Sequence, residues 1–173
     1  MSLIYINPYN FAAANYAIGD TGPGGGKVFY VSGNTYYEFA PSQGARTWAT
    51  GGNQSIAVTG ADGTAIGTGY QNSLDIVAQS GNVSASCAAV LARNYNGGGF
   101  SDWFLPSRYE MEEMVSTRST TGFSNGGTLT WTSSETAATR AFILWDNYVI
   151  LDGPNFSGKG FTARVNPVRT GTV

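Results

Sequence analysis

Hydrophobic and polar residues follow two different periods along the chain. Near the start, residues 27–31 and 36–40 are rich in aromatic and β-branched side chains, and a polar Ser-Gly-Asn turn separates them. This pattern predicts two strands joined as a hairpin. Apolar residues then recur at helical spacing, and beyond about residue 125 they alternate with a period of two. We expect helices over 72–79, from Ser84 or Ser86 to Asn94, and over 108–115, and strands over 129–132, 140–145, 148–151 and 161–165.

The strongest local signal is the start of the helix at residue 108. Ser107 is followed three residues later by Glu110, the capping-box spacing in which each side chain accepts a hydrogen bond from a backbone N–H. Pro106 keeps the residue before it extended, so a buried strand-like segment leads into this helix. We expect one core to hold the large apolar residues around this junction, namely Trp103, Leu105, Met111, Trp131 and Val165.

The order of the elements is a hairpin, then helices, then several strands, which is an α+β plan with antiparallel sheets and two to three short helices. With 173 residues the chain fits one domain, here residues 18–173. The 24 glycines indicate tight turns and long glycine-rich loops. Residues 1–17 have no clear period and are interpreted as an N-terminal arm or as a frayed terminus. In an arm, Leu3, Tyr5 and Phe11 would contact another subunit or a particle.

Composition excludes several kinds of chemistry. The net charge of −2 gives no basic surface for nucleic acid. There is no histidine and one cysteine, so an internal disulfide, a Cys/His zinc site and a Ser-His-Asp triad are all impossible. Cys87 is interpreted as a buried thiol. The N-terminus lacks a signal-peptide pattern, and no apolar stretch is as long as the roughly 18 residues of a membrane span, so we expect no membrane insertion.

The remaining candidates for chemistry are weak. The glycine-rich run at 21–28 departs from the phosphate-binding loop, because Thr21 and Val28 stand where glycine and Ser or Thr are needed. Among the acidic residues, Glu110 is accounted for by capping. Glu135, Asp146 and Asp152 fall at strand ends or loops, where they would hold a cation or be simply solvated. We therefore expect no enzyme, no cofactor and no metal.

Several segments, taken in order, carry a resemblance to one family. They are 18–30, 38–42, 66–69, 92–95, the 97–111 run, 131–135 and 163–169. Together they resemble an uncharacterised bacterial and phage domain family with a C-type-lectin-like fold, found as the C-terminal domain of a collagen-like adhesin. The family is related to phage tropism determinants and to the formylglycine-generating-enzyme fold. The calcium-binding motifs of animal C-type lectins and the catalytic cysteine pair of that enzyme are absent, so neither site is carried over.

The resemblance implies a single C-type-lectin-like domain that recognises or assembles rather than catalyses. The leading hypothesis is a phage virion surface protein, either a tail-fibre receptor-binding protein or a capsid or tail decoration protein, that binds a host glycan or protein. The alternative is a bacterial cell-surface adhesin domain that binds polysaccharide. Related receptor binders imply a homo-oligomer, most simply a trimer, in contact with other virion proteins.

In lectin-like folds the ligand surface lies on the late strands and their loops. Here that region is rich in aromatic, Asn, Asp and Gly residues, which suit stacking and short hydrogen bonds. The other interpretation is ordinary hairpin chemistry, with a turn at Asp146 and Asn147. The predicted ligand-binding residues are Trp145, Asn147, Tyr148, Asp152, Asn155 and Phe156.

Overall fold

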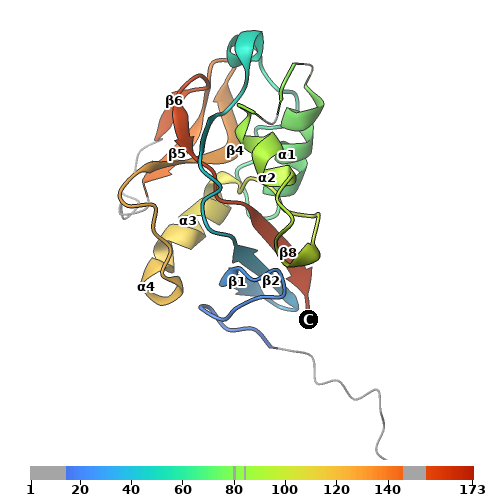
Figure 1. The fold of residues 1–173 in the computed structure, drawn as a ribbon, viewed down its shortest axis with the longest axis vertical. Helices are drawn as coiled ribbons and strands as arrows, with labels where there is room; N and C mark the ends of the chain where they lie inside the picture. Colours follow the sequence, from blue (N-terminus) through green and yellow to red (C-terminus); the bar gives the residue numbers. More distant parts are fainter. Residues whose placement is uncertain (1–14, 80, 84, 146–154) are drawn as a thin grey trace, which may run out of the picture.

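The computed structural model describes residues 15–79, 81–83, 85–145 and 155–173, and within them the fold is a mixed α+β arrangement (Figure 1). Two sheets lie toward opposite ends of the long axis. The lower one joins the start and the end of the described chain, and the upper one is packed beside two helices, α1 and α2. The α+β expectation is confirmed at this level.

The first sheet has three strands in the order β1-β2-β8. Strand β1 spans Lys27–Ser32, β2 spans Thr35–Phe39 and β8 spans Val168–Thr172. Strands β1 and β2 form the expected antiparallel hairpin, and Gly33 supplies the positive φ of 57° that its tight turn requires. Strand β8 pairs antiparallel with β2, so the C-terminal strand completes a sheet begun more than 120 residues earlier.

The second sheet has five strands in the order β3-β7-β4-β5-β6. Their bounds are Ala45–Thr47, Thr162–Arg164, Leu129–Ala137, Arg140–Trp145 and Phe156–Gly158, respectively. Most pairs are antiparallel, but β4 and β7 run parallel and meet at a single pair, Thr130 with Arg164. The second sheet is therefore mixed, whereas the first is antiparallel as expected.

The sequence pattern did not separate β7 from β8. It predicts one closing strand over 161–165, whereas the chain leaves the second sheet after Arg164 and enters the first sheet at Val168. Pro167 lies between the two strands and has no N–H to donate to a ladder. Its carbonyl oxygen instead accepts a bond from Ala40 N at 2.8 Å. The crossing between sheets is thus fixed by contacts with residues far away in the sequence.

Four α-helices occur among the described residues, where two to three were expected. They are α1 (Gly69–Ala78), α2 (Ala88–Arg93), α3 (Arg108–Ser116) and α4 (Arg118–Thr121), and two short 3-10 turns, η1 (Gly51–Ser55) and η2 (Gly97–Gly99), accompany them. The capping box at α3 is confirmed: Glu110 N donates to Ser107 Oγ at 3.3 Å and Ser107 N donates to Glu110 Oε2 at 2.7 Å. No helix in the described part of the chain is long and apolar enough to cross a bilayer.

The five residues expected in one core are all buried but do not form one cluster. Leu105, Trp131 and Val165 pack with the helices α1 and α2 and with Trp48, whereas Met111 belongs to a second cluster beneath the first sheet. Trp103 belongs to neither cluster. Its ring lies against Tyr95 at a centroid distance of 4.9 Å, and its Nε1 donates to the Gly97 carbonyl at 3.1 Å. The expectation of a single core is therefore wrong.

The glycine-rich loop before β1 holds a carboxylate that belongs to the protein itself. Gly24 N and Gly26 N donate to the two oxygens of Glu38, each at 2.9 Å. Glu38 is completely buried on β2. The backbone donors that a phosphate-binding loop would offer to a ligand are therefore used inside the fold.

Candidate functional site

The candidate site is a cleft at the end of the second sheet, with a volume of about 470 Å³. Strands β4 and β7 are joined only at Thr130 and Arg164, and the residues that precede this pair on both strands line the cleft. Ala45 of β3 and Trp145 of β5 complete it on either side. Consecutive residues of β7 line the cleft, and their side chains point to opposite faces of the sheet. The cleft therefore lies between β4 and β7, where these strands separate, and not on one face of the sheet. The lining consists of Ala45, Gly127, Thr128, Leu129, Trp145, Phe161, Thr162, Ala163 and Arg164.

Two aromatic side chains in the lining face solvent. Trp145 is 41% exposed and Phe161 is 45% exposed. Phe161 is held by an edge contact with the buried ring of Trp131, at a centroid distance of 6.4 Å. Trp131 is fixed in turn, since its Nε1 donates to the Arg46 carbonyl at 2.9 Å. One exposed ring thus rests on a rigid support, which is the arrangement that stacking on a ligand requires.

The polar part of the described lining is small and carries one cation. Among the described residues that line the cleft, Arg164 is the charged one, and Thr128 and Thr162 provide hydroxyl groups. The Arg164 side chain is exposed and makes no hydrogen bond or ion pair with another described residue. Its guanidinium donors are therefore available to a ligand.

A buried lysine fixes the turn that carries Phe161. Lys159 is fully buried, and its Nζ donates to Glu135 Oε2 at 2.9 Å and to the Ile56 carbonyl at 2.7 Å. The ammonium also lies 4.6 Å from the ring centroid of Trp48, and Trp48 N donates to the Lys159 carbonyl at 2.9 Å. The turn between β6 and β7 is thus attached to the core two residues before the exposed phenylalanine.

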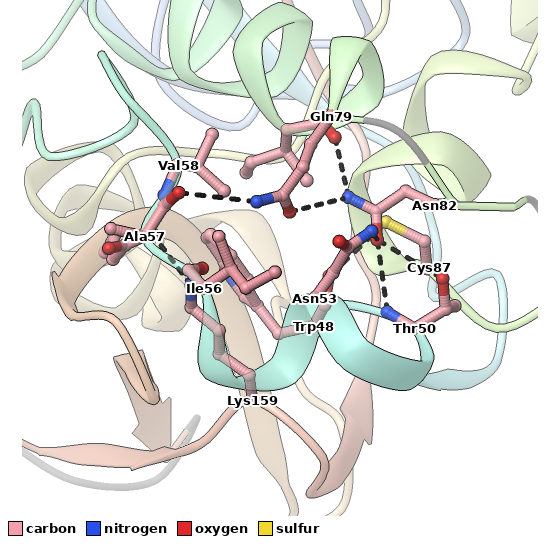
Figure 2. A network of polar contacts seen from close by, with 12 residues as sticks. Trp48, Thr50, Asn53, Ile56, Ala57, Val58, Gln79, Asn82, Cys87 and Lys159 are labelled. Carbon is pink, nitrogen blue, oxygen red and sulfur yellow. Dashed lines mark hydrogen bonds and ion pairs between the residues drawn. The ribbon is translucent and has the colours of Figure 1, made fainter.

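Figure 2 shows a network of amide side chains that lies, like this lysine, beside Trp48. Asn82 Oδ1 accepts bonds from Thr50 N at 3.1 Å and from Asn53 Nδ2 at 3.2 Å, while its Nδ2 donates to the Ile76 carbonyl at 2.7 Å. Gln79 continues the network to the Ala57 carbonyl at 3.3 Å. These bonds connect η1 to the end of α1, so the network stabilises the two segments that pack beside Trp48.

The single thiol of the protein, Cys87, lies in the same region. Cys87 is fully buried, as expected, and its Sγ donates to the Trp48 carbonyl at 3.3 Å. Burial raises the pKa of the Cys87 thiol above its ordinary value. A neutral buried thiol is a poor nucleophile, so Cys87 serves packing.

The proposed cation role of Glu135 does not fit its surroundings. Its carboxylate is buried and accepts bonds from Lys159 Nζ and from Val58 N, the latter at 2.8 Å. The suggestion that Glu135 holds a cation, or is simply solvated, is therefore wrong, because a lysine already neutralises it. Within the described ranges, no three His, Cys, Asp or Glu side chains gather as a metal site would require.

The structure separates the predicted ligand-binding residues that it describes. Trp145 lines the cleft. Phe156 lies directly opposite Phe142 on β5, and because side chains alternate along a strand, it faces away from Trp145. Its ring lies 4.8 Å from the guanidinium of Arg140. Asn155 is exposed, and its carbonyl accepts a bond from Ile143 N at 2.9 Å.

The other predicted contact residues fall on parts of the chain that the structure does not describe. Asn147, Tyr148 and Asp152, with the turn expected at Asp146 and Asn147, lie within 146–154, and Leu3, Tyr5 and Phe11 lie within 1–14. Their roles therefore stay predictions.

Sequence reasoning missed two residues that line the cleft, Phe161 and Arg164, and the buried Lys159 that supports it. Phe161 and Arg164 were expected only as members of a strand, and Lys159 was given no role. Apolar Phe161, Ala163 and Val165 alternate with polar residues, which predicts a strand but not the exposure of Phe161 at its beginning. For Lys159, flanked by two glycines, no local signal indicates burial.

Comparison with protein-family models gives no match, and comparison with curated proteins gives no match either.

Proposed function

We propose that the protein is a non-enzymatic recognition module with a C-type-lectin-like fold, and that the cleft between β4 and β7 is its ligand site. The observation that carries the proposal is the pair of exposed aromatic side chains, Trp145 and Phe161, in a cleft whose wall is attached to a buried lysine. A cleft of about 470 Å³ with aromatic walls and few polar groups is typical of a binding site for a small ligand. The ligand is a glycan or an exposed segment of a host protein.

The proposed setting is the surface of a phage particle, as a tail-fibre tip or a decoration protein. The support is the ordered series of motifs described above together with the mixed α+β fold. The second sheet, whose strands line the cleft, lies toward the other end of the long axis from the first sheet (Figure 1). A bacterial cell-surface adhesin that binds polysaccharide is the alternative. Mass spectrometry of purified particles distinguishes the two, since a virion protein is present there in stoichiometric amounts.

Binding to an array of bacterial surface glycans and to intact host cells tests the site. The double variant Trp145→Ala/Phe161→Ala should lose binding, because aromatic residues at the centre of an interface typically contribute about 2 kcal/mol or more each. Phe156→Ala is the matched control: this phenylalanine is similarly exposed, at 40%, but lies outside the cleft. Unchanged binding by a folded double variant would contradict the proposal, as would loss of binding in the Phe156→Ala control alone.

In the proposed homotrimer, the N-terminal arm supplies the contacts between subunits. Sedimentation velocity of the full chain should give a trimer. The variant Leu3→Ser/Tyr5→Ser/Phe11→Ser should be a folded monomer, because the change removes the apolar contacts and leaves the domain core intact. A monomeric wild type at micromolar concentration would contradict this part of the proposal.

A further inference from the structure

We propose that the cleft selects a saccharide that carries a carboxylate, such as a uronic or sialic acid, and that Arg164 binds this carboxylate. The inference rests on the proposed function and adds the chemical class of the ligand. It follows from three features of the cleft: its charge, the state of its arginine and the nature of its walls.

The charged side chains among the described residues that line the cleft have one sign. No acidic residue is found among the described residues that line it, and Arg164 is a cation. The chain as a whole carries a net charge of −2, so this local positive charge stands against the general trend. A guanidinium presents donors in a planar fork that matches a carboxylate with two parallel hydrogen bonds. The geometry of the residue itself therefore favours an anion of this shape.

The Arg164 side chain, unlike that of most other arginines in the protein, is not held by a hydrogen bond or ion pair to another described residue. Arg169 and Arg108 form ion pairs with carboxylates. Arg93 and Arg118 donate to the carbonyls of Trp103 and Val115. By contrast, the Arg164 side chain has no hydrogen-bond partner in the described part of the chain. An exposed arginine in a cleft loses little when it exchanges water for a carboxylate, because it breaks no internal bond.

The walls of the cleft suit a sugar ring. Trp145 and Phe161 offer apolar faces on which the C–H side of a pyranose can stack, and Thr128 and Thr162 offer hydroxyl groups for its polar edge. Strand β4 separates β7 from β5, so the backbones that carry Arg164 and Trp145 are two strand spacings apart, about 10 Å. That spacing leaves room for a ring stacked on one side while its carboxylate reaches the arginine on the other.

The test compares matched ligands by isothermal titration calorimetry with the full chain. The probes are trigalacturonate and its methyl ester, and sialyllactose and lactose. We expect at least one acid to bind about tenfold or more tightly than its neutral partner, the range for hydrogen bonds to a charged group. Arg164→Gln should remove this preference while leaving the weak neutral binding. The affinity of the acid should also fall as salt is raised.

Arg140→Gln is the control, because Arg140 is also exposed and lies outside the cleft, over the ring of Phe156. It should keep the preference for the acid. Equal binding of acid and neutral partner, lost in Trp145→Ala/Phe161→Ala, would overturn the inference and leave the proposed function in place. An acid preference that survives Arg164→Gln would also overturn it. Failure to bind any of the four probes overturns the inference, and failure on the glycan array and on host cells as well overturns the proposed function.

Discussion

Arg169 and Glu38 face each other directly on β8 and β2, and Arg169 Nη1 donates to Glu38 Oε1 at 2.8 Å. Both side chains are nearly or completely buried. The other donors of Arg169 reach Asp102, from Nε at 3.0 Å and from Nη2 at 3.1 Å. Burial by itself lowers the pKa of Arg169, but the hydrogen bonds to Asp102, Glu38 and Tyr36 together raise it above its ordinary value. One guanidinium therefore connects the last strand, the hairpin and the segment before Trp103.

Replacing this arginine should destabilise the protein strongly. Arg169→Met leaves the carboxylate of Glu38 buried without its cation, and the usual loss in such a case is about 3–5 kcal/mol in the free energy of unfolding. The measurement is urea unfolding followed by tryptophan fluorescence. Arg140→Met is the control, since Arg140 is exposed and forms no ion pair with a described residue; its change should be about 1 kcal/mol or less. Similar losses in the two variants would contradict the role of Arg169.

The ion pair of Lys159 and Glu135 should contribute both to the stability of the protein and to ligand binding in the cleft. Lys159→Met leaves Glu135 unpaired and should reduce the free energy of unfolding by about 3–5 kcal/mol. In the double variant Lys159→Met/Glu135→Gln, the loss should be smaller than the sum of the two single losses, because no uncompensated charge remains. Both variants should also bind the cleft ligand more weakly, since Lys159 fixes the turn that carries Phe161. Additive losses in a double-mutant cycle would be the contrary result.

The buried carboxyl of Glu110, in the capping box, should make a contribution to the free energy of unfolding that depends on pH. Burial raises the pKa of Glu110 above the ordinary value of 4.5, although backbone N–H groups of Ser107 and Gly67 act in the opposite direction. Between these two pKa values the folded protein binds more protons than the unfolded chain. The contribution of Glu110 is therefore fully present below 4.5 and is lost as the pH rises through the folded pKa.

The variant Glu110→Gln isolates this contribution. The stability advantage of the wild type over the variant should shrink as the pH is raised from about 4 to about 8. Unfolding by urea at several pH values measures it, with Glu113→Gln on the same helix in parallel. An advantage that grows with pH would mean that the backbone donors outweigh burial and lower the pKa of Glu110.

The glycine-rich loop should tolerate no side chain where it approaches Glu38. A Cβ on Gly24 would lie 2.5 Å from Trp103 Cζ2 and 2.9 Å from Glu38 Oε1, and the tryptophan ring is fully buried. Gly24→Ala should therefore lower the free energy of unfolding by about 1–3 kcal/mol or more. Gly52→Ala is the control, because a Cβ there meets no atom within 4 Å, and it should be neutral or slightly stabilising. Thermal unfolding of the two variants makes the comparison, and equal melting temperatures would contradict this view of the loop.

Features whose signals lie within a few residues of one another could be predicted from the amino-acid sequence. The helix start at Ser107 depends on a partner three residues away, and the hairpin of β1 and β2 depends on a short turn with Gly33. The burial of Cys87 and the failure of 21–28 as a phosphate loop were likewise readable from neighbouring residue types. The α+β class followed from the change of hydrophobic period near residue 125.

Features that depend on partners distant in the chain could not be predicted in this way. Strand β8 exists because β2 offers it a free edge, and β7 meets β4 in parallel at a single pair, so a cleft opens beside it. Lys159 is buried because Glu135 and Trp48, 24 and 111 residues earlier, surround its ammonium. Local spacing carries no information about such contacts, since a charged residue between glycines has the same local pattern on a surface as in a core. Burial of a charge is decided by the partners that the fold assembles around it.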